Sequence, residues 1–442
     1  MAAARGDLWL DELWSLQLAR DARSALDVFW GIHHDNNDYL NTLWMMLGGD
    51  GAPPLFQRAL SVASGIGLVA LGAIAPLHRG RLEAAITALL LAGSRFLVHY
   101  GSEARGYGPG MFCALAAFVV LDRFFATRER RWAAAFAVVG ALGILSHLTF
   151  VFVLTGAGVW VAVDWVLRKR ASPIALALFA FPVALLGFLW LVDVRFLTVG
   201  GAPRYEGAAV LPDLAAATLG LPEGPLRWLA LAFAAAAGFE LFELARARDL
   251  RAGFFAGCFL APLSYLAVLQ PEHVWPRHFA VLVPLFLVLA GAGLTRLAGL
   301  GRAGQAAALA ALAWFAVGNA VQLGSLLRDG RGHYRAAVLL ILENSPPGPV
   351  TVGSFNDFRN RMVLDDQARR LGVQSRIVYV PAAELRSRPP DWLLMHDFSL
   401  APMRREYLDV GGHIYGLAEV FPYAGLSGWS WLVYHQLPGL PR

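Results

Sequence analysis

Two short polar stretches in an otherwise apolar chain carry the residue types from which a group-transfer site could be built. In the first, Tyr100–Tyr107, Glu103 and Arg105 stand two residues apart, flanked by glycines that let the backbone turn tightly. The second contains the acidic pair Asp11-Glu12. A carboxylate can take a proton from a hydroxyl group, and a guanidinium can offer paired hydrogen bonds to a phosphate. We expect the two stretches to meet on one side of a membrane and to form an active site there.

The surroundings of Asp11 and Glu12 favour a catalytic role over a structural one. Apolar residues on both sides, Leu8-Trp9-Leu10 and Leu13-Trp14, predict a segment that lies flat on the membrane surface at headgroup depth. A carboxylate at that depth is partly desolvated, which makes it a better base. The alternative interpretation is a helix N-terminus, where acidic residues complement the helix dipole.

The loop with Glu103, Arg105 and Tyr107 is the second candidate. It is expected on the outer face of the membrane, where an arginine runs against the usual bias of positive charge towards the cytoplasm. An outer arginine between two spans is well placed to bind a lipid phosphate. The alternative is a plain outer turn whose arginine and tyrosine anchor it at the interface.

Further polar residues fall in two other stretches that are expected outside. Within His33–Tyr39, the residues His34, Asn37 and Tyr39 are candidates for binding an acceptor or a sugar. A divalent metal ion is an alternative there, although adjacent histidines in one loop seldom bind the same ion and the spacing matches no strong metal signature. The stretch Glu272–His278 contains Arg277, which could make a second phosphate contact.

Composition places these residues in a membrane protein. Of the 442 residues, 57% are hydrophobic and 16% are charged, against about 25% charged in a typical soluble domain. The apolar residues gather in blocks of roughly 18–25 residues, which suits a helix that crosses about 30 Å of hydrocarbon. The net charge of +5 comes from arginine clusters between these blocks, so they indicate membrane orientation and not nucleic-acid binding. Cys113 and Cys258 fall inside apolar spans, as packing residues would.

The apolar blocks predict about ten membrane-spanning helices in a central domain of residues 53–327. The expected spans are Leu55–Leu77, Leu82–Val98, Pro109–Phe125, Trp132–Leu148, Thr149–Leu167, Pro173–Val192, Leu226–Leu244, Phe254–Leu269, Phe279–Leu297 and Gln305–Leu326.

Arginine clusters occupy every second connection between the spans, which places those connections in the cytoplasm. The N-terminal stretch 1–52, the Glu103 loop, Arg195–Pro225 and the residues after Leu327 are then expected outside. This topology needs something to carry the N-terminal stretch across the membrane, so we expect a first helix that this sequence lacks.

The chain becomes polar after Leu327, and residues 328–442 are predicted to form a small α/β domain. A helix over His333–Glu343 precedes a strand, helix, strand pattern: Val350–Phe355, Asp357–Leu371 and Arg376–Val380. Asp391–His396 is a further short strand, and Tyr415–Phe421 and Trp429–His435 are expected to add edge strands.

Taken together, these stretches resemble the membrane-embedded GT-C glycosyltransferases, and within them the family 39-like enzymes related to protein O-mannosyltransferases and lipid A aminoarabinose transferases. The matching elements, in chain order, are Asp11–Ser15, His34–Leu40, Arg58–Ser61 with Gly65, Ser102–Tyr107 and Pro276–Phe279 with Pro284. The Glu-Ala-Arg-x-Tyr loop is the most specific of them. Two departures are that 36–39 lacks the family's Pro-Pro and that His278 stands where the family has tyrosine.

The resemblance implies an all-α polytopic membrane helix bundle of GT-C type, integral to a bacterial-type inner or plasma membrane, with its active site and C-terminal domain extracytoplasmic. It implies an inverting transfer of a sugar from a polyprenyl-phosphate donor to a lipid, glycan or protein acceptor, with Asp11 as base. Arg105 and Arg277 would bind the donor phosphate, Glu12 and Glu103 would orient the acceptor or Asp11, and Arg58 and Tyr107 would line the substrate site.

Two other classes of protein are alternatives to this one. A transporter or flippase of a lipid-linked sugar would place ionisable residues near the middle of the membrane and often shows paired interrupted helices. Here most charges lie at the ends of spans and no repeated half is visible. A purely structural assembly subunit would not need the polar outer loops.

Overall fold

The computed structural model of the chain describes residues 2–49, 51–168, 173–198, 207–221, 230–269, 274–399 and 403–437. Two compact units make up the fold: Leu18–Leu323 forms one, and Met1–Gln17 together with Gly324–Arg442 forms the other. We call them the helical unit and the sheet unit. The boundaries fall within helices α1 (Leu10–Asp21) and α16 (Arg302–Asp329).

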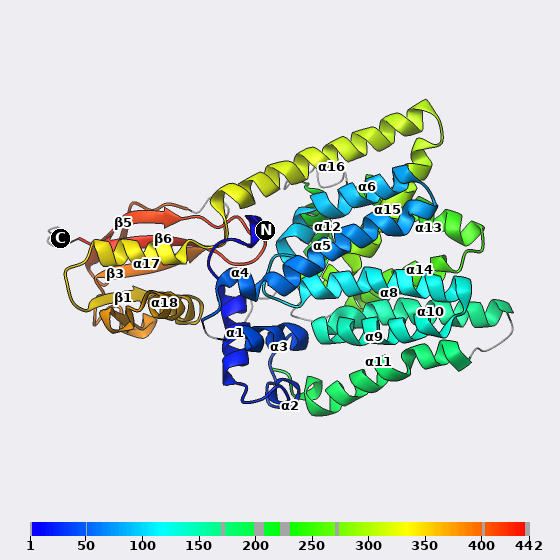
Figure 1. Cartoon of the computed structure of the whole chain (residues 1–442). Coiled ribbons are helices and arrows are strands. Elements are labelled where there is room, and N and C mark those ends of the chain that lie inside the picture. Colours follow the sequence, from blue (N-terminus) through cyan, green and yellow to red (C-terminus); the bar gives the residue numbers. More distant parts are fainter. Residues whose placement is uncertain are drawn as a thin grey trace. The chain divides into compact units, whose positions relative to one another are not determined.

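The helical unit consists of helices, most of them long and apolar (Figure 1). In chain order they are α2 Asp27–Trp30, α3 Tyr39–Gly48, α4 Pro54–Gln57, α5 Ala59–Ile74, α6 Arg81–Gly93, α7 Arg95–Tyr100, α8 Tyr107–Thr127, α9 Arg130–Ser146, α10 Val151–Arg168, α11 Pro173–Val192, α12 Gly207–Leu219, α13 Ala230–Arg246, α14 Arg251–Leu269 and α15 Val283–Ala298. The 3₁₀ segments η2 Ala75–His78, η3 Leu148–Phe150, η4 Val194–Phe196 and η6 Pro276–Leu282 lie between them.

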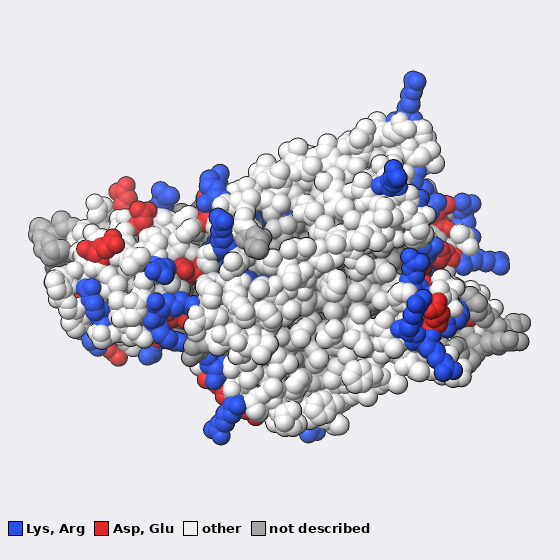
Figure 2. Space-filling view, viewed as in Figure 1, with Lys and Arg blue, Asp and Glu red and all other residues white. Residues whose placement is uncertain are grey.

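The helices have the character of membrane spans. Within the described residues, seven helical segments are long and apolar enough to cross a membrane. Of the other predicted spans, α6, α9 and α13 contain 13, 17 and 17 residues. Figure 2 shows that the visible face of these helices is nearly free of charged side chains, which gather at one end of the bundle. A wide uncharged band suits contact with hydrocarbon, and the chain is an integral membrane protein.

One predicted span is broken shortly before the polar loop. The span Leu82–Val98 forms two helices, α6 and α7, because Ser94 between them is extended. Asn319 Oδ1 accepts the backbone N–H of Arg95 at 2.7 Å, and Ser94 donates its hydroxyl to the Thr218 carbonyl at 2.8 Å. Thr218 belongs to α12, a short apolar helix within a stretch that the sequence placed in an outer loop.

The sheet unit contains one six-stranded sheet with two helices on one face (Figure 1). Its elements are α17 Tyr334–Glu343, β1 Val350–Ser354, α18 Asp357–Leu371, β2 Ile377–Val380, β3 Trp392–Asp397, β4 Tyr407–Val410, β5 His413–Phe421 and β6 Ser430–Gln436. The strand order is β2-β1-β3-β6-β5-β4, parallel from β2 to β3 and antiparallel from β3 to β4.

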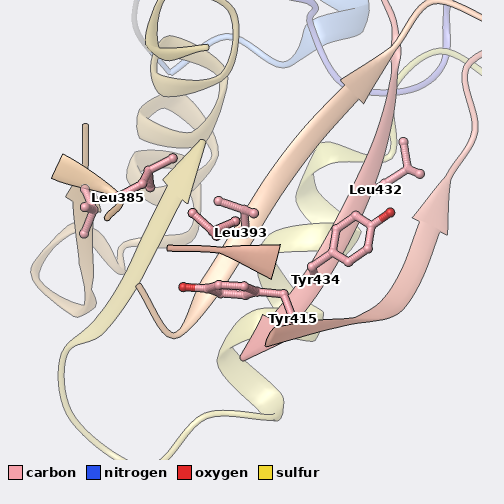
Figure 3. Packing of buried hydrophobic residues seen from close by; sticks show 7 residues of the cluster. Leu385, Leu393, Tyr415, Leu432 and Tyr434 are labelled. Carbon is pink, nitrogen blue, oxygen red and sulfur yellow. The ribbon is translucent and has the colours of Figure 1, made fainter. Parts of the chain in front are cut away.

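The prediction that the last two strands lie at the sheet edges is wrong. Strand β6 lies inside the sheet between β3 and β5. Strand β5 pairs on its other side with β4, an edge strand that was not predicted from the sequence. The alternation along β6 explains its place. Leu432 and Tyr434 enter the buried cluster of Figure 3 on one face, and Trp431 packs against Tyr334 of α17 on the other. A strand that is buried on both faces is central.

The N-terminal residues belong to the sheet unit, whereas the sequence grouped residues 1–52 as one segment. Arg331 Nε donates to the carbonyl of Ala3 at 3.0 Å, and the Asp7 carboxylate accepts the backbone N–H of Arg335 at 2.7 Å. Trp9 packs edge-on against Trp429, with ring centroids 6.3 Å apart. These contacts fix the start of α1 on the sheet unit.

Candidate active site

A buried ion pair lies at the centre of the candidate site in the helical unit. Arg105 Nε lies 3.1 Å from Asp38 Oδ2, and the side chains are 4% and 6% exposed. The same oxygen accepts the backbone N–H of Gly106 at 2.9 Å. Asp38 therefore fixes both the guanidinium and the backbone at the start of α8.

The backbone of the Arg105 loop is held from two other helices. Asn41 of α3 donates to the carbonyl of Ala104 at 2.9 Å, and Ser61 of α5 donates to the carbonyl of Arg105 at 2.9 Å. Gly106 is required at its position, because a Cβ atom there would collide with the carbonyl oxygen of Ser146 and approach the Asp38 carboxylate. The predicted polar loop is thus a buried, tightly held turn.

Glu103 and Tyr107 lie on either side of Arg105 in this turn. His99 Nε2 is 2.9 Å from Glu103 Oε1, and both side chains are fully buried. The Arg105 guanidinium lies 5.5 Å from the centre of the Tyr107 ring, a cation–π distance. The Tyr107 ring in turn lies 4.9 Å from the His147 ring. Glu103 is thereby directed towards His99, and Tyr107 towards Arg105 and His147.

Arg277 acts on the same histidines as Arg105. His147 experiences the charges of Asp38, Arg105 and Arg277, and His278 those of Arg277 and Arg105. Arg277 lies in η6, and its guanidinium is 5.5 Å from the centre of the Trp275 ring. The positive charges of both arginines therefore act on His147 and His278, and a region of positive charge favours an anion such as a phosphate.

The polar side chains of His33–Tyr39 mostly hold the chain in place. Asn37 donates to the carbonyls of Val28 and Ile32, at 2.7 and 3.1 Å, and accepts from Thr42. Tyr39 donates to Asp193 at 2.5 Å, and burial together with this carboxylate raises the pKa of its hydroxyl, which stays protonated.

His34 is half-buried. Its Nδ1 accepts the backbone N–H of Asn36 at 3.0 Å and lies 3.0 Å from Asp35 Oδ1. Arg58, between α4 and α5, is fully buried. Glu272 and His273 fall outside the described residues. No cluster of three or more His, Cys, Asp or Glu side chains suited to a metal ion occurs among the residues that the structure describes.

The acidic pair lies in the first turn of α1, in the sheet unit. Glu12 is fully buried, and its carboxylate accepts the backbone N–H of Trp9 at 3.2 Å. This hydrogen bond closes the start of the helix as the acidic half of a capping box does. Asp11 is partly exposed. The two carboxylates therefore differ in their surroundings, although they are neighbours in the chain.

An apolar groove is lined in part by η6, the element that carries Arg277. It has a volume of about 530 Å³ and lies among α12, α13, α14 and η6, where its lining includes Leu211, Leu231, Phe259, Phe279 and Leu282. Phe279 and Leu282 follow Arg277 in η6. An extended hydrocarbon chain suits such a groove.

Three residues of this site could not be recognised from the sequence. Asp38 pairs with Arg105, Asp193 accepts from Tyr39 and also lies 2.8 Å from His33, and His147 contacts Tyr107. Asp38 lies within the polar stretch His33–Tyr39, but its partner lies 67 residues away in the chain. His147 lies at the boundary of two predicted spans, and its position in the sequence gives no sign of a contact with Tyr107.

The helical bundle with its small C-terminal sheet unit defines a membrane protein of GT-C fold, and the predicted fold class is confirmed. The solved structures similar to this chain include ArnT, an aminoarabinose transferase from Cupriavidus metallidurans. The apo state has a TM-score of 0.55 at 13% identity over 98% of this chain and 94% of ArnT. The form bound to undecaprenyl phosphate has a TM-score of 0.51 at 15% identity over 100% and 96%. No family model and no curated protein sequence matches the chain.

Proposed function

We propose that the protein is an inverting glycosyltransferase that moves a sugar from a polyprenyl-phosphate donor to an acceptor on the extracytoplasmic face of the membrane. The observation that carries the proposal is the buried ion pair Asp38–Arg105, which holds a guanidinium in place within the helical unit. A rigidly held guanidinium stabilises a phosphate without reorganisation at the moment of reaction.

The apolar groove supports a lipid-linked donor. Arg277 at the start of η6 would bind the donor phosphate, and the polyprenyl chain would follow the groove lined by Phe279 and Leu282. The similar ArnT structure that holds undecaprenyl phosphate agrees with this ligand class.

The chemistry requires one base. The acceptor hydroxyl attacks the anomeric carbon, the bond from that carbon to the phosphate oxygen breaks, and the polyprenyl phosphate leaves with the bonding electrons. A phosphate ester anion is a good leaving group, so no acid is needed where a glycosidase would use two carboxyl groups. We assign the base to Asp11, which would take the hydroxyl proton, and the stabilisation of the leaving phosphate to Arg105 and Arg277.

The proposal is tested with purified full-length protein in detergent micelles, where no compartments exist and transport gives no signal. Release of polyprenyl phosphate from synthetic polyprenyl-phosphate sugars is measured with membrane extract as the acceptor source. We expect Asp11→Asn to abolish transfer and Arg105→Ala to reduce it by about 10²–10³.

The matched control variants are Asp21→Asn, at the other end of α1, and Arg131→Ala, whose side chain is 70% exposed. Both should transfer like the wild type. Full activity of Asp11→Asn would remove the base assignment, and release of no polyprenyl phosphate by the wild-type protein from any donor would remove the proposed activity.

A further inference from the structure

A second cluster of functional side chains lies in the sheet unit, away from Arg105 in the chain. It consists of Arg359, His396, Phe398 and Trp429, which we call the Arg359 cluster. Arg359 Nη1 is 2.8 Å from His396 Nε2. Its guanidinium lies 4.6 Å from the ring centre of Phe398 and 6.0 Å from that of Trp429.

The topology of the sheet brings these residues together. Strands β1 and β3 are adjacent and parallel, so their carboxyl ends meet at one edge, where open α/β sheets bind ligands. Arg359 lies in the first turn of α18, which follows β1, while His396 and Phe398 lie at the end of β3. Trp429 precedes β6, whose first residue pairs with Asp397 of β3.

Among the residues that the structure describes, no carboxylate forms an ion pair with Arg359, and burial lowers the pKa of its guanidinium. Asp397, the acidic residue of β3, accepts the backbone N–H groups of Ser399 and Met403, at 2.7 and 3.0 Å. A half-buried guanidinium beside a neutral imidazole and two rings keeps its capacity to bind an anion.

The residue after Arg359 anchors this part of α18. Asn360 is fully buried; it donates to Ser354 Oγ at 2.6 Å and accepts from Trp431 Nε1 at 2.8 Å. These bonds tie the first turn of α18 to β1 and β6. Side chains that are held in this way lose little freedom when a ligand binds, which favours affinity.

The aromatic rings of the cluster indicate what kind of group the ligand carries beside its anionic group. Phe398 is 59% exposed although it lies beside the guanidinium, so one aromatic surface is open next to an anion-binding group. The apolar face of a sugar ring packs on such a surface as other apolar groups do. We propose that the Arg359 cluster binds an anionic sugar, with Arg359 on the phosphate or carboxylate and Phe398 against the ring.

This role rests on the proposed function. If the protein transfers a sugar to an acceptor as proposed, the anionic sugar is part of that acceptor. The helix that carries Asp11 packs beside the cluster within the sheet unit: Trp9 contacts Trp429, and Trp14 contacts Phe358 at 5.2 Å. The sheet unit would then hold the acceptor next to the helix that carries the proposed base, while the helical unit holds the donor.

The binding site is tested with the full chain in phosphatidylcholine nanodiscs. Binding of glucose 6-phosphate, glucose and inorganic phosphate is measured by saturation-transfer NMR and calorimetry. We expect glucose 6-phosphate to bind more tightly than either fragment. Arg359→Gln should weaken its binding at least tenfold, and Phe398→Ala should weaken glucose 6-phosphate but not inorganic phosphate.

The matched control is Arg361→Gln, in the same helix, since Arg361 is largely exposed and pairs with Asp365. It should bind like the wild type. In transfer assays, Arg359→Gln should raise the KM for the acceptor about tenfold and leave kcat and the KM for the donor unchanged.

The outcomes separate the two proposals. Binding of glucose 6-phosphate that depends on Arg359, without transfer from any donor, would uphold the site and remove the proposed function. Transfer with unchanged binding and acceptor KM in Arg359→Gln would overturn the site. Binding only to phosphatidylglycerol nanodiscs, without competition by glucose 6-phosphate, would identify a membrane contact and overturn it too.

Discussion

The carboxylate of Asp38 holds Arg105 Nε at 3.1 Å and the backbone N–H of Gly106 at 2.9 Å, so one buried side chain fixes both the guanidinium and the helix start beside it. A lone buried guanidinium would be costly, and the pairing keeps Arg105 charged and oriented. The relationship connects the stretch His33–Tyr39 to the Glu103 loop, two places that the sequence could only treat separately.

Replacing Asp38 with asparagine should affect both stability and donor use. Breaking a buried ion pair typically costs about 3–5 kcal/mol, because the remaining charge stays buried without compensation. We expect a lower thermal unfolding temperature and a raised KM for the donor in Asp38→Asn, measured on the same preparation. Asp35→Asn is the control, since the Asp35 side chain is 40% exposed. Equal effects of the two substitutions would contradict the special role of Asp38.

A methyl group at Gly106 should disrupt the turn. Its Cβ would collide with the Ser146 carbonyl oxygen and crowd Asp38, so the loop or α9 must shift. Such overpacking costs about 1–3 kcal/mol. We expect Gly106→Ala to unfold at a lower temperature than the wild type and to transfer sugar poorly. Gly158→Ala in α10, where a Cβ meets nothing within 4 Å, is the matched substitution and should be neutral or stabilising.

Glu12 and Asp11 should respond differently to loss of charge. Glu12 is buried and accepts the Trp9 N–H, so Glu12→Gln should lower the thermal unfolding temperature by weakening the start of α1, at a cost of about 1 kcal/mol. Asp11→Asn should leave that temperature unchanged. The comparison is made by differential scanning fluorimetry on both variants. A larger loss of stability in Asp11→Asn would reverse the assignment.

The stability of the sheet unit should depend on His396 below neutral pH. Burial, together with the charge of Arg359 and against that of Asp397, lowers the pKa of His396 to about 4 from an ordinary 6.5. Between these values the unfolded chain binds a proton that the folded chain does not, so stability falls as the pH is lowered from 6.5 towards 4.

Thermal unfolding at pH 7 and pH 5 measures this dependence. We expect the unfolding temperature of the wild type to drop more between the two pH values than that of His396→Gln, because the variant lacks the titrating group. His413→Gln on β5 serves as control and should keep the wild-type difference. An identical pH response in the wild type and His396→Gln would show that the half-buried imidazole does not contribute.

The sequence by itself determined the membrane class and most of the helices. Apolar runs of the right length force helices in hydrocarbon, since every backbone group must be satisfied within its own segment, and α11 matches its predicted bounds residue for residue. The strand and helix pattern of the C-terminal part was equally local: α18 begins and ends where the sequence placed it, between the Asn356 cap and Gly372.

Only the tertiary structure decided which side chains meet. The pairing of Asp38 with Arg105, of Tyr39 with Asp193, and of Arg359 with His396 each joins residues far apart in the chain, and no local periodicity reports such contacts. The same holds for the interior position of β6, because strand order follows from how two faces are buried. Helices and strands follow from residues that are neighbours in the chain, whereas a functional site depends on how distant segments pack together.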